Sequence, residues 1–319
     1  MIALVAAPSS LGLRPPYPGA VPGAWRAPEA LREAGLFDRL AAAAGARDAG
    51  TVPTAPYVDD DAVRPAGRVR NEAALVDHSR RLAQRIDEVL DAGDAPLVIG
   101  GDCSILLGAG LALARRGGTG LVHLDGHTDF RHPGNSDACA SVAGEDLAAA
   151  VGLHWAAIAD IDGAGPYFAA ARTVHLGHRD DDEHAAEARR TLGLVVSAAE
   201  ALGRPETLAR AAAPGQLGAP GRPTAQLAER IRATAGTGYW LQLDVDLLDP
   251  SVMPAVDSPD PGGLDAATVT ALLAELAPAA IGASVTVFDP ELDPDGRYAR
   301  LLADVVVEGL GGLGSALHR

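Results

Sequence analysis

The sequence of 319 residues contains no lysine, so all 26 of its basic residues are arginines. Without a lysine amine, Schiff-base catalysis, a pyridoxal linkage and a P-loop lysine are excluded. Acidic residues number 42, which gives a net charge of −16. That charge opposes the basic surface on which nucleic-acid binding depends. We therefore expect a small cationic or neutral substrate and no nucleic-acid partner.

Long apolar runs and a basic leader are also missing. No stretch reaches about 18 consecutive apolar residues, so no membrane span is expected, although a hydrophobic content of 48% suffices for a large core. The opening MIALVAAPSS carries no arginine before its short apolar stretch, unlike a secretory signal. Two cysteines, Cys103 and Cys139, do not make a disulfide framework. We expect a globular cytoplasmic protein.

Short apolar runs that are typical of buried parallel strands recur along the chain: IALVAAP, APLVIGGD, TGLVHLDGHTD, RTVHLGHRD, LGLVVSAAE, YWLQLDVD and ASVTVFDP. Between several of these runs, apolar residues recur at helical spacing, notably at 71–92 and at 266–276, where Asp265 provides a cap. This alternation predicts an α/β fold with a parallel sheet. Residues 204–222, rich in Pro, Gly and Ala, predict an irregular connection within one domain spanning 1–319.

Polar residues gather where three of these strands end, which is where open parallel sheets bind ligands. In D-x-H-x-D and D-x-D, alternate residues point to one side of an extended chain. Carboxylates so close together repel one another unless a cation neutralises them. Turn and cap residues are the alternative explanation of each motif alone. Together the motifs predict two divalent metal ions bridged by carboxylates and held by Cys103, Asp125, His127, Asp129, Asp244 and Asp246.

The motifs VIGGDCS, DGHTD and DVDLLDP, the last followed by PGGL, resemble those of the arginase, agmatinase and formimidoylglutamase (ureohydrolase) family. The similarity extends through APEALREAGL, LGHRD and FDPELDPDG. The resemblance implies a three-layer α/β/α fold with an arginase-like sheet, two Mn²⁺ ions and a homo-oligomer, trimeric or hexameric. It also implies roles for the ligands: bridging carboxylates (Asp125, Asp244), ligands of the first ion (Cys103, Asp129) and ligands of the second (His127, Asp246).

Residues that act on the substrate also follow from the resemblance. Asp129 is the expected catalytic residue, because it would orient the attacking water and carry its proton. Asp182, in GHRDDDE, resembles the aspartate that contacts the substrate's amino group, although a solvated loop acid has the same appearance. Asn135 and Ser136, in the loop after Asp129, are expected to bind a substrate carboxylate.

Three positions depart from the family pattern. Cys103 stands where the family has a histidine ligand, and a thiolate there would add negative charge and favour Zn²⁺ over Mn²⁺. A small buried thiol that binds no ion is the other interpretation. Ala143 stands at the proton-shuttle histidine, and we expect His132 and His154 to be surface residues that do not replace it. Val287 stands at the guanidinium-binding glutamate.

The departures shape the predicted function. Asp289 or Glu291 can reach the site from the loop that carries Val287. We expect a binuclear-metal hydrolase that cleaves a C–N bond of a guanidino, N-hydroxyguanidino or amidine compound other than plain arginine, releasing urea or an analogue. A formimino or amide hydrolase and a diverged non-catalytic metal-binding protein remain alternatives.

Overall fold

The computed structural model describes residues 1–203 and 223–317. The connection predicted at 204–222 lies outside the described residues. Eight parallel strands form one sheet in the order β2-β1-β3-β8-β7-β4-β5-β6. The strands are β1 (Ile2–Ala7), β2 (Arg47–Thr51), β3 (Ala95–Gly100), β4 (Leu121–Leu124), β5 (Thr173–Leu176), β6 (Leu194–Val196), β7 (Tyr239–Asp244) and β8 (Ala280–Thr286).

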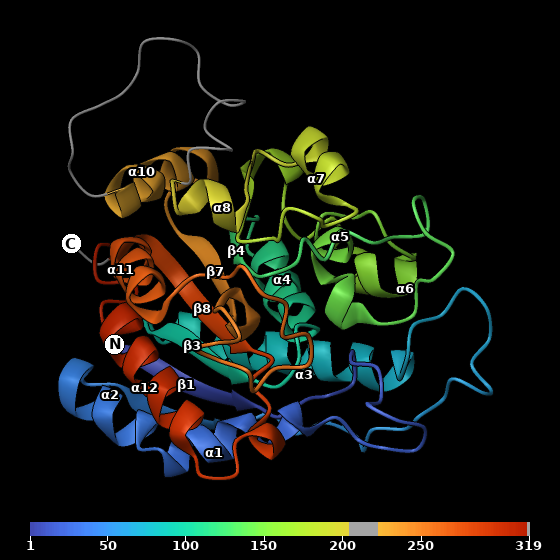
Figure 1. Cartoon of the computed structure of the whole chain (residues 1–319), viewed down its shortest axis with the longest axis horizontal. Helices are drawn as coiled ribbons and strands as arrows, with labels where there is room; N and C mark the ends of the chain where they lie inside the picture. The colour runs from blue at the N-terminus through green and yellow to red at the C-terminus, as the bar shows by residue number, and fades with distance from the viewer. Residues whose placement is uncertain (204–222, 318–319) are drawn as a thin grey trace.

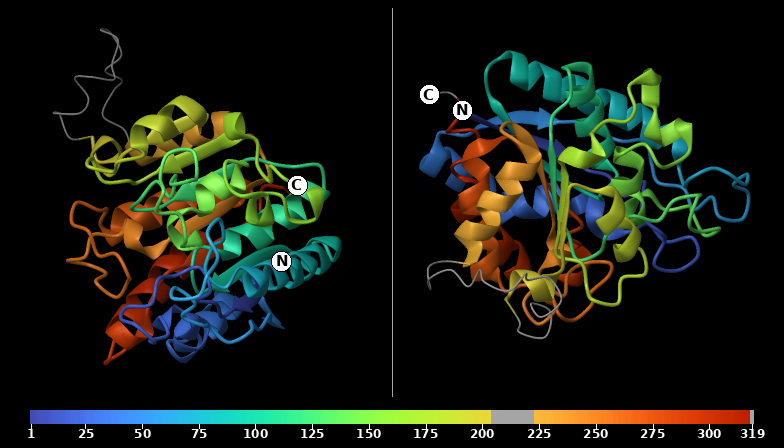
Figure 2. Two further views of the ribbon diagram at one scale, coloured as in Figure 1. Left: turned by 90° about the vertical axis from the view of Figure 1, so that its right-hand side faces the viewer. Right: turned by 90° about the horizontal axis from the view of Figure 1, so that it is seen from above.

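Helices cover both faces of the sheet and complete the predicted three-layer architecture (Figures 1 and 2). One face is covered by α1 (Ala27–Glu33), α2 (Leu36–Ala44), α8 (Ala198–Ala201), α10 (Pro223–Ala235), α11 (Ala266–Leu276) and α12 (Arg297–Leu310). The other is covered by α3 (Glu72–Asp91), α4 (Ile105–Arg115), α5 (Asp146–Ala150), α6 (Ala156–Ala159) and α7 (Ala185–Thr191). Among the described residues, no helix combines the length and the apolar character needed to cross a membrane.

Two apolar cores, one on each face, explain why the strands form where they do. In β1, Ile2 and Leu4 belong to one core, whereas Ala3 and Val5 belong to the other. A strand covered on both faces is apolar throughout, so its sequence is a continuous apolar run. All seven predicted runs contain a strand.

The eighth strand, β2, was not predicted. Its sequence RDAGT is mostly exposed at the edge of the sheet, where only the pairing with β1 defines it. The two predicted helices are confirmed. Asp265 caps α11 by accepting a hydrogen bond from the Thr268 backbone N–H at 2.8 Å, and α3 occupies nearly all of 71–92.

The order of the strands places the three ligand-bearing segments at one edge. The chain leaves β3 through α4 and returns as β4, and β8 and β7 later fill the space between these two strands. The carboxyl ends of β3, β8, β7 and β4 are therefore consecutive. Ligands in open parallel sheets bind at such a crossover.

Candidate metal centre

The D-G-H-T-D segment that follows β4 turns sharply over the end of the sheet. The His127 N–H donates to Asp125 Oδ1 at 2.7 Å, and the Gly126 N–H donates to Asp246 Oδ1 at 2.9 Å. Asp129 adopts a left-handed backbone conformation, with φ of 46°. An aspartate tolerates that conformation better than most residues, so the turn can keep the acid needed at its end.

Asp125, His127 and Asp246 form one group of possible ligands, whose atoms lie within 4.8 Å of one another. His127 Nδ1 is 2.8 Å from Asp246 Oδ2, and its Nε2 is 3.0 Å from Asp260 Oδ2. Burial disfavours the charged imidazole, but the bond to Asp246 and its charge outweigh this and raise the pKa of His127 to about 10. Positive charge is therefore strongly stabilised beside Asp246. In the metal-free protein, the protonated imidazole of His127 provides this charge.

Cys103, Asp125 and Asp129 form a second group of possible ligands within the same distance. Asp125 belongs to both groups, as a bridging carboxylate would. Cys103 is buried and donates its thiol to Asp244 Oδ2 at 2.8 Å. Asp244 also accepts from the Asp246 N–H at 2.8 Å. The structure thus brings all six predicted side chains together, and their roles as ligands remain predictions.

The donor set fits divalent ions. Burial, followed by repulsion from neighbouring carboxylates, raises the pKa values of Asp125, Asp129 and Asp244 well above those of ordinary aspartates. Asp125 Oδ2 is buried without a hydrogen-bond partner among the described residues. Buried oxygen ligands with unmet charge are what Mn²⁺, Mg²⁺ or Zn²⁺ would satisfy.

All six side chains line one cavity of about 1010 Å³. Ala143 and Val287 line it too, at the positions where the family pattern has catalytic side chains. Val287 has a φ of 73°, which is strained for a β-branched residue. Outside the ligand set the cavity wall is strongly acidic, since it includes Asp181, Asp182, Glu183, Asp257, Asp260, Asp289 and Glu291 against Arg14, Arg131 and Arg179.

Asp182 lies in this wall, but its carboxylate already has a structural task. It accepts hydrogen bonds from the Thr128 N–H and the Thr128 hydroxyl, both at 2.7 Å, and from the His184 N–H at 2.9 Å. Asp182 therefore stabilises the turn that carries the predicted ligands. Sequence reasoning predicted a substrate contact for it and missed this bracing role.

Asn135 and Ser136 were expected to face the substrate, but the structure does not place them among the described residues of the cavity wall. The Asn135 amide donates to the Phe130 carbonyl at 3.0 Å and to Glu187 Oε2 at 2.9 Å. Its oxygen accepts from the His132 N–H. These bonds hold Asn135 within its own loop, and the substrate contact of Asn135 and Ser136 stays a prediction.

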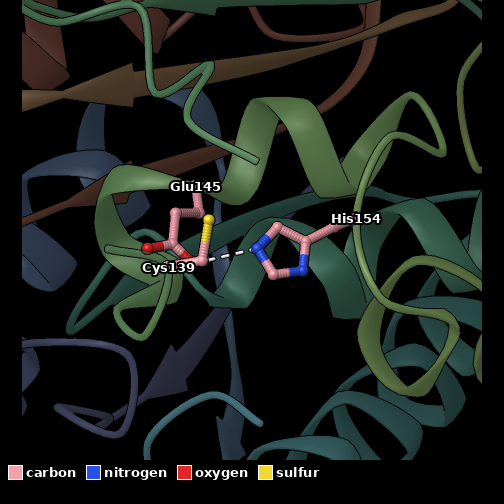
Figure 3. A group of neighbouring side chains, drawn as sticks. All are labelled: Cys139, Glu145 and His154. Carbon is pink, nitrogen blue, oxygen red and sulfur yellow. Dashed lines mark hydrogen bonds and ion pairs between the residues drawn. The ribbon is translucent and has the colours of Figure 1, made fainter. Parts of the chain in front are cut away.

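His132 and His154 are not the surface histidines that we expected. The His132 ring is nearly buried and lies 3.3 Å from Glu187. The side chain of His154 is fully buried, and its Nε2 is 2.9 Å from Glu145 (Figure 3). Each ring is paired with an acid away from the cavity, and neither lines it. Neither histidine supplies the side chain that Ala143 lacks.

Glu145 organises the loop that carries Ala143. Its Oε1 accepts from the backbone N–H groups of Ala140 and Ser141 and from Arg131 Nε at 3.2 Å, while Oε2 faces His154 (Figure 3). Cys139 lies beside this pair. This buried acid fixes the loop and Arg131 in the cavity wall, a relationship that no sequence motif displayed.

Asp257 and Asp260 are further residues that sequence reasoning missed. Both line the cavity from the VDSPDPGGL stretch. Their position shortly after DVDLLDP was the available signal, because that motif carries Asp244 and Asp246 in the cavity wall.

Comparison with known proteins agrees with this geometry. The family model described as "Arginase family" matches residues 2–311. An arginase from Bacillus caldovelox is 30% identical over 241 residues, which cover 74% of this chain and 75% of that protein. A formimidoylglutamase from Aeromonas hydrophila is 30% identical over 238 residues, 71% of this chain and 65% of that protein. The chain belongs to the arginase family.

A solved structure extends the comparison to the fold. The native arginase from Bacillus caldovelox superposes with a TM-score of 0.81 at 26% sequence identity, covering 98% of each chain. The predicted three-layer, arginase-like sheet is confirmed. A metal-dependent hydrolase is accordingly the class of enzyme that the fold and the family define.

Proposed function

We propose that this chain is a binuclear-metal hydrolase that cleaves a C–N bond of a small guanidino, N-hydroxyguanidino or amidine compound, releasing urea or a urea analogue. One observation carries the proposal: Asp125 belongs to two ligand groups that meet in the wall of one acidic cavity. Two ions there, Mn²⁺ by family resemblance, would supply Lewis acidity and an activated water for attack on the planar C=N carbon.

The chain's own residues handle the proton and the substrate. Asp129 lies at the cavity wall, and burial followed by repulsion from Asp146 raises its pKa well above the ordinary value. A carboxylate of raised pKa is a better proton acceptor near neutral pH, so Asp129 suits the role of general base. The acidic wall favours a cationic group, and Asp289 and Glu291 lie in it beside Val287.

The substrate class follows from two replaced side chains. Ala143 cannot protonate a leaving amine, and Val287 cannot bind a guanidinium, yet both line the cavity. A leaving group that needs less protonation tolerates the first replacement. N-hydroxyguanidines satisfy this condition, because the hydroxyl lowers the basicity of the group. We therefore place N-hydroxyguanidino compounds ahead of arginine.

A substrate panel tests the proposal. The protein is stripped of metal, reloaded with Mn²⁺ or Zn²⁺, and incubated with arginine, N-hydroxyarginine, agmatine, simple amidines and formiminoglutamate. We expect release of hydroxyurea from N-hydroxyguanidino compounds or of ammonia from simple amidines, and at most slow release of urea from arginine. Formamide or ammonia from formiminoglutamate alone would replace the proposal with a formimino hydrolase. Two bound ions without turnover of any compound would indicate a non-catalytic protein.

A further inference from the structure

Two further buried polar residues lie against the predicted metal ligands. His123, on β4, and Asp146, at the start of α5, are both fully buried. Neither lines the cavity. His123 Nε2 and Asp146 Oδ1 have no hydrogen-bond partner among the described residues, and the same holds for Asp125 Oδ2. Each such buried polar group costs about 1–3 kcal/mol, so three that face one another call for an explanation.

The distances between these atoms fit the coordination of a metal ion. His123 Nε2 lies 3.4 Å from Asp125 Oδ2 and 3.6 Å from Asp146 Oδ1. Both contacts are too long for good hydrogen bonds. Ligand atoms about 2.1 Å from a tetrahedral ion are separated by about 3.4 Å. Asp129 completes the group, because a ligand atom of its carboxylate lies within 4.8 Å of those of His123 and Asp146.

The residues behind His123 support a ligand role. Its Nδ1 is 3.0 Å from His175 Nδ1, on the neighbouring strand β5. His175 is fully buried as well. When His123 donates from Nδ1 to His175, the lone pair on Nε2 faces the carboxylates. Metal-binding histidines are usually oriented in this way, through a hydrogen bond from the other ring nitrogen.

Asp146 is oriented by a chain of three hydrogen bonds. Trp240 Nε1 donates to Ser284 Oγ at 3.0 Å, and Ser284 Oγ donates to Gln242 Oε1 at 2.8 Å. This fixes the Gln242 amide, which donates from Nε2 to Asp146 Oδ2 at 2.9 Å. One carboxylate oxygen is thereby held and the other is left free to bind. Hydrogen-bonded carboxylates of this kind are typical around metal sites.

We propose that His123 and Asp146, together with Asp129 and Asp125, bind one of the two divalent ions, while Cys103 remains a thiol bonded to Asp244. The proposal rests on the proposed function for the presence of two ions and assigns ligands to one of them. His123 provides the imidazole that the family pattern has at the position of Cys103. A neutral imidazole also avoids the additional negative charge of a thiolate beside the carboxylates.

Metal stoichiometry of three variants tests this assignment without reference to turnover. Metal-free wild type, His123→Asn, Asp146→Asn and Cys103→Ser are dialysed against Mn²⁺ or Zn²⁺ and analysed for metal content. We expect two ions in wild type and Cys103→Ser, and an affinity at least about 100-fold weaker for one ion in the other two variants. The amide oxygen introduced by Asp146→Asn would still accept the Gln242 hydrogen bond, and far-UV circular dichroism checks the fold of each metal-free form.

X-ray absorption at the zinc edge of the loaded wild-type protein keeps the test decisive if a variant fails to fold. We expect a shell of nitrogen and oxygen at about 2.0–2.1 Å, whereas a sulfur ligand would scatter at about 2.3 Å. A sulfur shell, or wild-type metal affinity in both folded variants at His123 and Asp146, would overturn the proposal. Two ions bound by wild type without substrate turnover would count against the proposed function alone.

Discussion

The thiol of Cys103 donates a hydrogen bond to Asp244 Oδ2 at 2.8 Å, inside a cluster of carboxylates. Burial is the main reason why the pKa of this thiol is raised well above the usual value, and the charges of Asp244, Asp146, Asp129 and Asp125 add to it. In the metal-free protein, Cys103 is therefore a neutral hydrogen-bond donor. The sequence pattern predicts a metal ligand at this position, with a small buried thiol that binds no ion as the other interpretation.

Alkylation of Cys103 tests whether this residue is an accessible thiolate. In Cys139→Ser, Cys103 is the only cysteine, and only a thiolate reacts with iodoacetamide. We expect the folded, metal-free variant at pH 8 to react at least about 100-fold more slowly than the same protein unfolded in urea. Intact-mass spectrometry over time gives both rates. Comparable rates would mean that Cys103 is an accessible thiolate and would favour it as a metal ligand.

Metal removal should make stability depend on pH with a defined sign. Asp125, Asp129 and Asp244 have raised folded-state pKa values, and that of His127 is raised to about 10. The folded metal-free protein then holds protons that the unfolded chain releases, so its stability falls as pH rises. We expect the midpoint temperature of thermal unfolding of the metal-free protein to decrease as the pH is raised from 6.5 to 9.

The pH range begins at 6.5 because, below this pH, a buried histidine changes the stability of the protein in the opposite direction. Burial and the charge of Arg189 lower the pKa of His178 to about 4. The stability that this neutral histidine contributes to the folded protein is therefore lost as the pH falls below about 6.5. Saturating Mn²⁺ should reverse the trend, because ions replace the protons, and should add about 4 kcal/mol per site at a concentration 1,000-fold above Kd. Calorimetry with and without chelator checks both statements. A metal-free midpoint that rises above pH 6.5 would contradict them.

Removing the brace behind the D-G-H-T-D turn should weaken metal binding. Asp182→Ala leaves the Thr128 N–H and hydroxyl without their acceptor, and we expect metal affinity to drop about 10- to 100-fold, as for other residues that orient ligands. Asp182→Asn keeps one acceptor oxygen and should have a smaller effect. Asp181→Asn is the matched control, because Asp181 also lines the cavity but is exposed. Equal losses of metal affinity in the variants at Asp182 and Asp181 would show that the loss results from removing negative charge and not from removing the hydrogen bonds to Thr128.

The sequence was informative wherever one segment carried its own pattern. Continuous apolar runs located the strands, and the D-x-H-x-D and D-x-D spacings located the ends that meet at the cavity. It failed for β2, whose exposed residues are placed by backbone pairing. It also gave no sign of the hydrogen bond between Asn135 and Glu187, which lies 52 residues further along the chain.

His123 shows most clearly which part of the site a sequence motif cannot predict. The residue lies within the predicted strand run TGLVHLDGHTD and is fully buried. Its Nε2 has no hydrogen-bond partner among the described residues. The atoms that face it belong to Asp146, which comes from a different element, and to Asp125, which follows the end of its own strand. No local pattern relates the histidine to the helix. Contacts between distant elements therefore define the part of the site that motifs leave out.

The acidic wall should select for positive charge in the substrate. Glu291 lines the cavity, is half exposed and pairs only at 3.6 Å with Arg26. Such an exposed charge contributes about 1 kcal/mol or less, so Glu291→Gln should raise KM about fivefold for a cationic guanidino substrate and leave kcat unchanged. Glu29→Gln is the control, because Glu29 is exposed and does not line this cavity.

Comparing substrates of different charge separates electrostatic attraction from shape. For a neutral amidine analogue, Glu291→Gln should leave KM unchanged, since no charge interaction is lost. Adding salt should shrink the wild-type preference for the cationic substrate, because exposed charges about 10 Å apart are screened at 0.1 M. Steady-state kinetics at low and moderate salt provide the measurement. The same fivefold rise for both substrates would assign Glu291 to the shape of the wall and remove charge as the basis of selection.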